Sequence, residues 1–536
     1  MVGSSNGVKK LYLYLCFFSF SVTNGSSSNQ SSGDIKNIRR SNFPDGFFFG
    51  TSTSAYQIEG AFVEDGKSLS NWDVFTHSKG SHNKDATGDV ADNHYHLYSE
   101  DIEIMHSLGI NAYRFSISWS RILPRGRLGE VNPKGVEFYN KIINALLLKG
   151  IEPFVTINHG DFPQELEDKY GSWLSPLMQD DFVYFAETCF KVFGDRVKYW
   201  MTLNEPNSVA QFGYMKGIGP PSRCSYPFGN CSFGNSQIEP LIVMHNMLLA
   251  HAKAAYIYRD TFQQRQGGVI GMTVSAMMYE PMRDENELDY KAARRALAFN
   301  LAWVYDPLIF GDYPPEMREY HREELPAFSI EEKLLLKRSI DFIGINHYST
   351  LYAKDCIFST CLNGNTLIEG FTFTSGYNIN TCSFIGEPTA MARFFVVPRG
   401  MEEIIEYIKE RYNNNKPIFV LENGYAQSLQ NTNVEDSIED VKRVEFHKEY
   451  LDSLAKAIRN GADVRGYFIW SLMDNFEWGL EYSIAFGLYY VDRQTLQRIP
   501  RLSAKWYKDF LTNNTLHSVT IKQIKESFLG NNLVFL

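Results

Sequence analysis

The sequence predicts an α/β protein built as a single (β/α)8 TIM barrel. Between residues 43 and 511, short apolar stretches typical of buried strands alternate with longer stretches whose apolar residues recur at three- and four-residue spacing. Eight strands, each followed by helix, is the count of such a barrel. A doubly wound open sheet is the alternative, but no Gly-rich phosphate loop follows the first strand, which favours the barrel.

The predicted strands are rich in apolar, β-branched and aromatic residues and occupy 46–54, 112–119, 153–158, 199–203, 269–278, 342–346, 418–421 and 466–470. Amphipathic helices are expected between them, most clearly over 135–149, 240–262 and 441–460. No low-complexity linker interrupts this alternation, so one catalytic or binding domain is expected over 43–511.

The two ends of the chain differ from the predicted barrel. Lys9 and Lys10 precede an apolar run over 11–22, which small and polar residues follow. This charge–apolar–small order is typical of a secretory signal peptide, assigned to 1–26, and the run is too short to span a membrane. Residues 27–42 are expected to form an N-terminal extension and 512–536 a C-terminal tail. The protein is therefore expected to be secreted to the cell wall or apoplast, with the vacuole as the alternative.

Cysteine usage agrees with export. Cys224 and Cys231 flank a loop rich in Pro, Gly and Ser, where an oxidising compartment would close a short disulfide. Cys356 and Cys361 could close a second loop, whereas Cys189 lies in an apolar helical stretch and is expected to be a buried free thiol. Glycosylation acceptor triplets begin at the residues Asn29, Asn230 and Asn513.

Composition excludes several kinds of partner. A net charge of −10 and a pI near 5.7 argue against nucleic acid. Metal-ligand spacings of the zinc kind are absent from the sequence, so neither a metal nor another cofactor is expected. The expected partner is a small molecule, with no membrane association after removal of the signal. The oligomeric state cannot be inferred from the sequence.

Unusual polar residues follow the predicted strands, where the catalytic groups of a barrel lie. Glu205 follows the fourth strand, and Glu422 directly follows the apolar run 418–421. A helix cap or a strand-end ion pair would explain either Glu alone, but two on one rim can face each other about 5 Å apart. Glycoside hydrolysis with retention needs such a pair, one an acid and one a nucleophile. The charge of Glu422 should raise the pKa of Glu205 and keep it protonated.

Five stretches resemble family 1 glycoside hydrolases and occur in the order found in that family. They are FFFGTSTSAYQIEG at 47–60, RFSISWSRILP at 114–124, TLNEP at 202–206, LENG at 421–424 and WSLMDNFEW at 470–478. The region 220–252 is similar to the plant branch of the family, and 346–361 is similar to plant enzymes acting on monolignol glucosides such as coniferin and syringin.

The resemblance implies a role for each matching position. Glu205 would be the acid/base and Glu422 the nucleophile, supported by hydrogen bonds from Arg114 and Tyr348. The residues expected to hold the glucosyl unit are Gln57, His159, Asn204, Tyr348, Trp470, Glu477 and Trp478, with Phe486 closing the pocket. Taken singly, most of these would be ordinary core or surface residues, and the joint pattern alone assigns them to a site.

The sequence departs from the family at the pocket entrance. Gly160 stands where many relatives carry a large residue, and Arg393 where relatives usually have a Trp that stacks on the leaving group; Glu481 and Ala485 are also unusual. These changes spare the glucose pocket and leave the aglycone open. Phenolic, monolignol-type glucosides are the leading expectation, with oligosaccharides as competitors. The sequence does not separate hydrolase from transglucosidase, and a non-catalytic sugar-binding barrel remains a third alternative.

Overall fold

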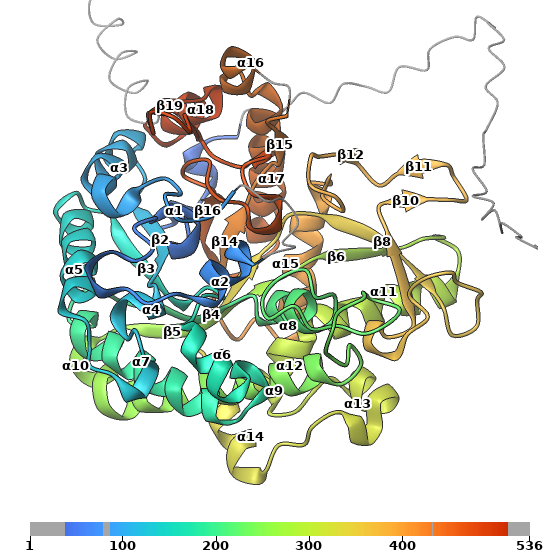
Figure 1. Cartoon of the computed structure of the whole chain (residues 1–536). Helices are drawn as coiled ribbons and strands as arrows, with labels where there is room; N and C mark the ends of the chain where they lie inside the picture. The colour runs from blue at the N-terminus through green and yellow to red at the C-terminus, as the bar shows by residue number, and fades with distance from the viewer. Residues whose placement is uncertain (1–37, 79–85, 431–432, 513–536) are drawn as a thin grey trace, which may run out of the picture. The chain divides into compact units, whose positions relative to one another are not determined.

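The computed structural model describes residues 38–78, 86–430 and 433–512 (Figure 1). Within these residues eight parallel strands close into a barrel in the order β1-β16-β14-β7-β5-β4-β3-β2, which confirms the predicted fold. The strands are β1 (Phe48–Ser52), β2 (Ala112–Ser116), β3 (Glu152–Asn158), β4 (Tyr199–Asn204), β5 (Val269–Ser275), β7 (Phe342–Asn346), β14 (Ile418–Asn423) and β16 (Val464–Trp470). Every predicted strand overlaps one of them.

Helices cover the outside of the barrel (Figure 1). The longer ones are α3 (His94–Leu108), α5 (Pro133–Leu148), α7 (Leu177–Phe193), α9 (Glu239–Ile257), α11 (Glu287–Leu297), α15 (Arg399–Arg411), α17 (Val441–Arg459) and α18 (Leu502–Thr512). The helix predicted over 240–262 is α9 continued by a π-helix, Tyr258–Gln263. Its start is marked by Pro240, because a proline in the first turn lacks only an N–H that has no intrahelical partner there.

Shorter helices complete the βα connections. They are α1 (Ala55–Ile58), α2 (Asn71–His77), α4 (Trp119–Ile122), α6 (Gln164–Tyr170), α8 (Pro206–Tyr214), α10 (Gln264–Gln266), α12 (Trp303–Phe310), α13 (Pro315–His321), α14 (Ile330–Lys337) and α16 (Val434–Ile438). Of these, α8 matters most for the site, because it begins directly after Glu205.

Small sheets stand above the strand ends. The largest joins β6 (Met278–Pro281), β8 (Thr350–Asp355) and β9 (Thr372–Ser375). The others are the pairs β10 (Tyr377–Asn378) with β11 (Ser383–Phe384), β12 (Glu387–Pro388) with β13 (Phe395–Val396), β15 (Gln427–Ser428) with β17 (Ile484–Ala485), and β18 (Tyr489–Val491) with β19 (Arg498–Pro500). These sheets hold the long βα loops in place over the barrel.

Aromatic and aliphatic side chains fill the lower part of the barrel. They form one buried cluster of Ala112, Phe154, Met201, Phe342, Phe419, Leu421 and Phe468. Phe154 stacks on Tyr199 with ring centroids 4.1 Å apart. The interior is therefore a packed core, as in other barrels of this kind, and polar chemistry is confined to the carboxyl ends of the strands.

Both expected loop closures are present. Cys224 pairs with Cys231 and Cys356 with Cys361, while Cys189 is a buried free thiol as predicted. No helix in the described ranges is both long and apolar enough to cross a membrane. The predicted signal peptide, most of the N-terminal extension and all but the first residue of the C-terminal tail lie outside the described residues.

Candidate active site

Irregular strand pairing changes which side chains face the barrel axis at the ends of β4 and β14, the strands that lead to Glu205 and Glu422. In β14, Phe419 and Leu421 point into the barrel core, so strict alternation would place Asn423 inward next. The register to β7 shifts between Val420 and Glu422, which sets Glu422 opposite Asn346. Because the extra residue of a bulge re-aims the side chains that follow it, the acid at 422 takes the inward position.

The pairing of β4 is irregular in the same way. Met201 faces the core, and the register to β5 shifts between Met201 and Asn204. Leu203 consequently packs outward with the helices, while Asn204 turns inward. Glu205 then caps α8 in the left-handed conformation, with φ 45°, and its N–H donates to the carbonyl of Thr273 at 2.8 Å. A non-glycine residue in this conformation is uncommon and often marks a functional position.

Glu422 lies in a buried, cationic setting. Its carboxylate accepts from Arg114 Nη1 at 2.5 Å and from the Tyr348 hydroxyl at 2.7 Å. Arg114 is fully buried and also donates to Asn204 Oδ1 at 2.6 Å and to Thr156 Oγ1 at 3.1 Å. Burial raises the pKa of Glu422, and the bonds from Arg114 and Tyr348 oppose that rise. The structure thus places both expected supporting residues on this carboxylate.

Glu205 is surrounded by neutral donors instead. Ser208 Oγ donates to Oε2 at 2.6 Å, and Asn346 Nδ2 donates to Oε1 at 2.7 Å. Burial and the negative charge of Glu422 raise the pKa of Glu205 to about 7. The carboxyl group without a cation in direct contact is therefore the one that retains its proton near neutral pH.

Asn346, the last residue of β7, lies between the strands that carry the two acids. Its amide donates to Glu205 at 2.7 Å, and Glu422 stands opposite it in the register of β14 and β7. Its side chain also opposes the rise in the pKa of Glu422. Two acids gathered at one end of a barrel suit attack on the sugar by one carboxylate while the other gives a proton.

Hydrogen bonds to three side chains orient the amide of Asn204, which points into the barrel. Its Oδ1 accepts from Arg114 and, at 3.1 Å, from Asn346. Its Nδ2 lies 3.0 Å from His159 Nε2, so His159 accepts there and carries its proton on Nδ1. Burial and the charge of Arg114 lower the pKa of His159, which keeps the ring neutral. The Nδ1 atom is buried without a partner among the described residues and can donate to a ligand hydroxyl.

Aromatic rings pack beside His159. His159 stacks at 5.9 Å on Trp470, the last residue of β16, and at 6.0 Å on Trp478. Trp478 in turn contacts Trp72 at 4.6 Å. Such surfaces suit the C–H faces of a sugar ring, which carry no hydroxyl groups.

Gln57 contacts the two residues that precede Glu477 in the chain. Gln57 Nε2 donates to Asn475 Oδ1 and to the carbonyl of Phe476, both at 2.9 Å, and its Oε1 accepts from Ser54. Burial and the charge of Glu422 raise the pKa of Glu477 to about 8. Gln57 retains one acceptor lone pair, and Glu477 can donate or accept, as the recognition of hydroxyl groups requires.

The predicted pocket-closing ring is also present. Phe486 is buried and meets Tyr348 edge to face at 5.8 Å. On the other side of Tyr348, Phe394 stacks at 4.9 Å. Both rings therefore lie one contact away from Glu422, through the hydroxyl-bearing ring of Tyr348.

Four further residues belong to this cluster without having been assigned a role from sequence. Asn346 ends β7 and donates to both Glu205 and Asn204. Ser208 lies three residues after Glu205 on α8, a spacing that brings side chains together and could have indicated it. Trp72 and Phe394 come from loops, and the sequence carries no local signal for their contacts.

At the entrance, Gly160 has φ +90°, and a Cβ built there would approach Trp72 and Val209 no closer than 3.9 Å. A methyl group would therefore be in ordinary contact with both residues, and the positive φ favours glycine at this position. In the described ranges no group of three or more His, Cys, Asp or Glu side chains could hold a metal ion. The site's chemistry can be performed by a protonated acid, a nearby ionised carboxylate and neutral hydrogen-bonding groups.

The model of glycosyl hydrolase family 1 matches residues 39–516. Among curated relatives, "Probable inactive beta-glucosidase 14" of Oryza sativa subsp. japonica is 52% identical over 90% of this chain and 93% of its own length. "Coniferin beta-glucosidase" of Pinus contorta is 50% identical over 90% of this chain and 94% of its own length.

A solved rice β-glucosidase mutant in a covalent complex with glucose is also similar. It is 45% identical, has a TM-score of 0.85, and the alignment covers 89% of this chain and 100% of that structure. The covalent complex of that relative agrees with a retaining mechanism, in which a carboxylate attacks the sugar and forms a glycosyl–enzyme.

The coupling between the two acids can be tested by Glu422→Gln. Removing the negative charge should lower the pKa of Glu205 below about 7, because that charge is one cause of the raised value. The pKa is measured by 13C NMR titration of labelled glutamate side chains, with Glu205→Gln to assign the signal. Glu152→Gln, at the first residue of β3, is the matched control and should leave the titration unchanged. A Glu205 pKa that stays near 7 in Glu422→Gln would contradict the coupling.

Proposed function

This chain belongs to glycosyl hydrolase family 1 and is a retaining β-glucosidase, and we propose that it acts on phenolic, monolignol-type β-D-glucosides with Glu422 as nucleophile and Glu205 as acid/base. The observation that carries the assignment of roles is the asymmetry of the two acids. Glu422 is bonded to a buried guanidinium, whereas Glu205 has only neutral donors and a pKa raised to about 7.

The first step breaks the glycosidic bond. A carboxylate oxygen of Glu422 attacks C1 of the glucosyl unit while Glu205 gives its proton to the departing aglycone oxygen. The products are a glucosyl ester on Glu422, a neutral alcohol or phenol, and an ionised Glu205. Glu422 loses its negative charge when the ester forms, which weakens its bond to Arg114. Arg114 still donates to Asn204 and Thr156, so its buried charge stays hydrogen-bonded.

The second step releases glucose. Ionised Glu205 removes a proton from water, the water oxygen attacks C1, and the ester bond to Glu422 breaks. Two inversions give net retention. An alcohol in place of water would give transglucosylation through the same intermediate, so the acceptor, rather than the two acids, decides between these outcomes.

The inner residues fit a glucosyl unit. His159 Nδ1 and Asn346 Oδ1 are buried polar atoms without partners in the described chain, and both adjoin Asn204. Trp470, whose ring stacks on His159, supplies a flat apolar surface beside them. A ring with hydroxyl groups at its edge and C–H bonds on its face would satisfy both kinds of group.

Support for a phenolic aglycone comes from aromatic rings around the site and from one relative. Trp72, against Trp478, and Phe394, against Tyr348, add aromatic surfaces next to the residues expected to bind glucose. The Pinus contorta relative is named for coniferin, a phenolic glucoside. Although the rice relative at 52% identity is named as inactive, both acids and their hydrogen-bond partners are present in this chain, which favours catalysis over sugar binding alone.

We expect the purified protein to hydrolyse p-nitrophenyl β-D-glucoside and coniferin, with β-glucose as the first product seen by 1H NMR. Glu422→Gln should lower kcat by about 10^4-fold or more, because the covalent step is lost. Glu152→Gln is the control and should retain activity. If the folded wild type hydrolysed none of a wide panel of glycosides, the chain would instead be a sugar-binding barrel.

The proposed location is the apoplast, with the vacuole as the alternative destination. The charge–apolar–small order of the first 26 residues supports export, and so do two disulfides, which persist in oxidising compartments. A C-terminal fluorescent fusion expressed in plant cells should appear outside the plasma membrane or in the vacuole, with its N-terminus removed near residue 26. Cytosolic protein with an intact N-terminus would contradict export.

A further inference from the structure

Ser208 places a hydroxyl group directly against the acid Glu205. Its Oγ lies 2.6 Å from Glu205 Oε2, and Asn346 Nδ2 lies 2.7 Å from Glu205 Oε1. Within the described ranges these are the two side-chain hydrogen bonds of the Glu205 carboxyl group, one on each oxygen. Because both partners are neutral, they differ in whether they can accept a hydrogen bond as well as donate one.

The contact of Asn346 with Glu205 runs in one direction only. Arg114 Nη2, which is always a donor, lies 2.6 Å from Asn204 Oδ1, so that atom is the amide oxygen. The Asn346 atom that contacts Glu205 also lies 3.1 Å from this oxygen and is therefore the amide nitrogen. Glu205 Oε1 consequently accepts a hydrogen bond in both protonation states, and Oε2 is the oxygen expected to carry the proton.

Ser208 is the partner on the oxygen that carries the proton. A serine hydroxyl both donates and accepts, and its hydrogen rotates about the Cβ–Oγ bond. Ser208 can accept from the protonated Oε2 and, after the proton has left, donate to the same oxygen without movement of any heavier atom. Hydrogen bonds to an ionised group are the stronger ones, so this contact stabilises the ionised acid more than the protonated acid.

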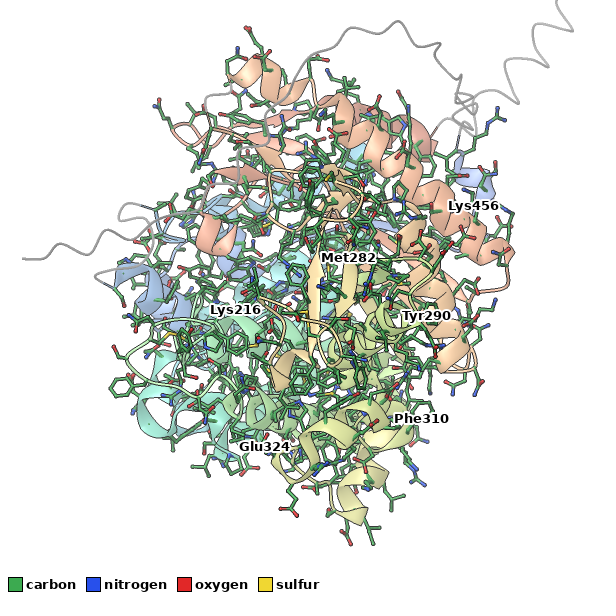
Figure 2. All side chains as sticks on the ribbon, turned by 90° about the vertical axis from the view of Figure 1, so that its right-hand side faces the viewer. Lys216, Met282, Tyr290, Phe310, Glu324 and Lys456 are labelled. Carbon is green, nitrogen blue, oxygen red and sulfur yellow. A yellow bond between two sulfur atoms is a disulfide. The ribbon has the colours of Figure 1, made fainter. Side chains whose placement is uncertain are left out.

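The backbone of α8, rather than the hydroxyl group itself, holds Ser208 in this place. The first turn is tied to β5 by Asn207, whose Nδ2 donates to the carbonyl of Ser275 at 2.8 Å. The other end of the helix is tied by Lys216, labelled in Figure 2, whose N–H donates to the carbonyl of Gln211 at 2.9 Å. Removal of the hydroxyl group should therefore leave the helix where it is.

The charged and titratable groups that influence Glu205 come from other elements. Burial and the charge of Glu422 on β14 raise its pKa, and Arg114 on β2 opposes that rise. Burial and the charges of Glu422 and Glu205 also raise the pKa of Tyr348, and that of Glu477 to about 8. This environment favours the protonated acid, and the two neutral donors act against it.

We propose that Ser208 is a positioning residue for the acid/base: it keeps the proton of Glu205 on Oε2 and turns from acceptor to donor as that proton leaves. The proposal rests on the proposed function, which takes Glu205 to give its proton to the leaving oxygen. In that step the O–H bond of Glu205 breaks, its electron pair stays on Oε2, and the leaving oxygen gains the proton. The hydrogen bond donated by Ser208 stabilises the charge left on Oε2 and so promotes the transfer.

The first readout is the pH profile of kcat/KM for p-nitrophenyl β-D-glucoside with the full-length enzyme. In Ser208→Ala the ionised acid loses one of its two donors, so the pKa of Glu205 should rise above about 7. The acid then stays protonated to higher pH, and the alkaline limb should move upward by about one pH unit. Ser208→Thr keeps the hydroxyl group and should restore the limb. Ser107→Ala, on α3, is the control and should leave it unchanged.

The second readout separates proton donation from general damage to the site. At about pH 5.5 Glu205 is protonated in every variant. Coniferin needs a proton on its leaving oxygen, whereas 2,4-dinitrophenyl β-D-glucoside releases a stable phenolate without one. Ser208→Ala should lower kcat/KM for coniferin by about five- to tenfold and that for the dinitrophenyl glucoside by less than about twofold. A merely structural role would lower both by the same factor.

The outcomes distinguish the two levels of the account. If the wild type hydrolyses both glucosides but Ser208→Ala keeps the alkaline limb in place, or lowers both substrates equally, the inference is wrong and the proposed function stands. If Glu205→Gln hydrolysed coniferin as fast as the wild type, Glu205 would not be the acid, and the proposed function would fail together with the inference.

Discussion

The buried guanidinium of Arg114 is the constraint around which the site is arranged. A cation with no exposed surface must have its donors satisfied, and Arg114 meets that requirement with Glu422, Asn204 and Thr156 from three different strands. These bonds tie β2, β3, β4 and β14 together at the end of the barrel. The one buried cation contacts Glu422, whereas burial and the charge of Glu422 raise the pKa of Glu205 to about 7 and that of Glu477 to about 8. The division of roles between the acids follows from this balance of charge.

Most of the fold could be predicted from the sequence, because each strand is a local apolar run and each crossover helix has its own periodicity. The acids at 205 and 422 were also visible, since each follows an apolar strand where a barrel places its catalytic groups. What local patterns could not give is the direction of the side chains. Simple alternation would turn Leu203 and Asn423 inward, and only the register shifts in β4 and β14 bring Asn204 and Glu422 there instead.

The loops around the two acids were the least predictable part. Trp72 contacts Trp478 and Phe394 stacks on Tyr348, and each pair joins segments far apart in the sequence. Asn346 shows the same limit closer to the two acids, because its role lies in hydrogen bonds to Glu205 and Asn204, which are far from it in the sequence. Residues defined by contacts between distant segments leave no periodic or local signature. For this reason the reaction could be inferred from sequence with far more detail than the aglycone.

The central claim is that Glu422, held by Arg114 and Tyr348, is the nucleophile whose carboxylate oxygen bonds to C1 in a covalent glucosyl–enzyme. The most direct measurement is mass spectrometry of the protein after incubation with an activated 2-deoxy-2-fluoro-β-D-glucoside, whose intermediate is hydrolysed slowly. The account predicts one fluoroglucosyl group per chain, mapped by peptide sequencing to Glu422, and none in Glu422→Gln. A label on Glu205 or elsewhere, or no label on an enzyme that still hydrolyses glucosides, would contradict it.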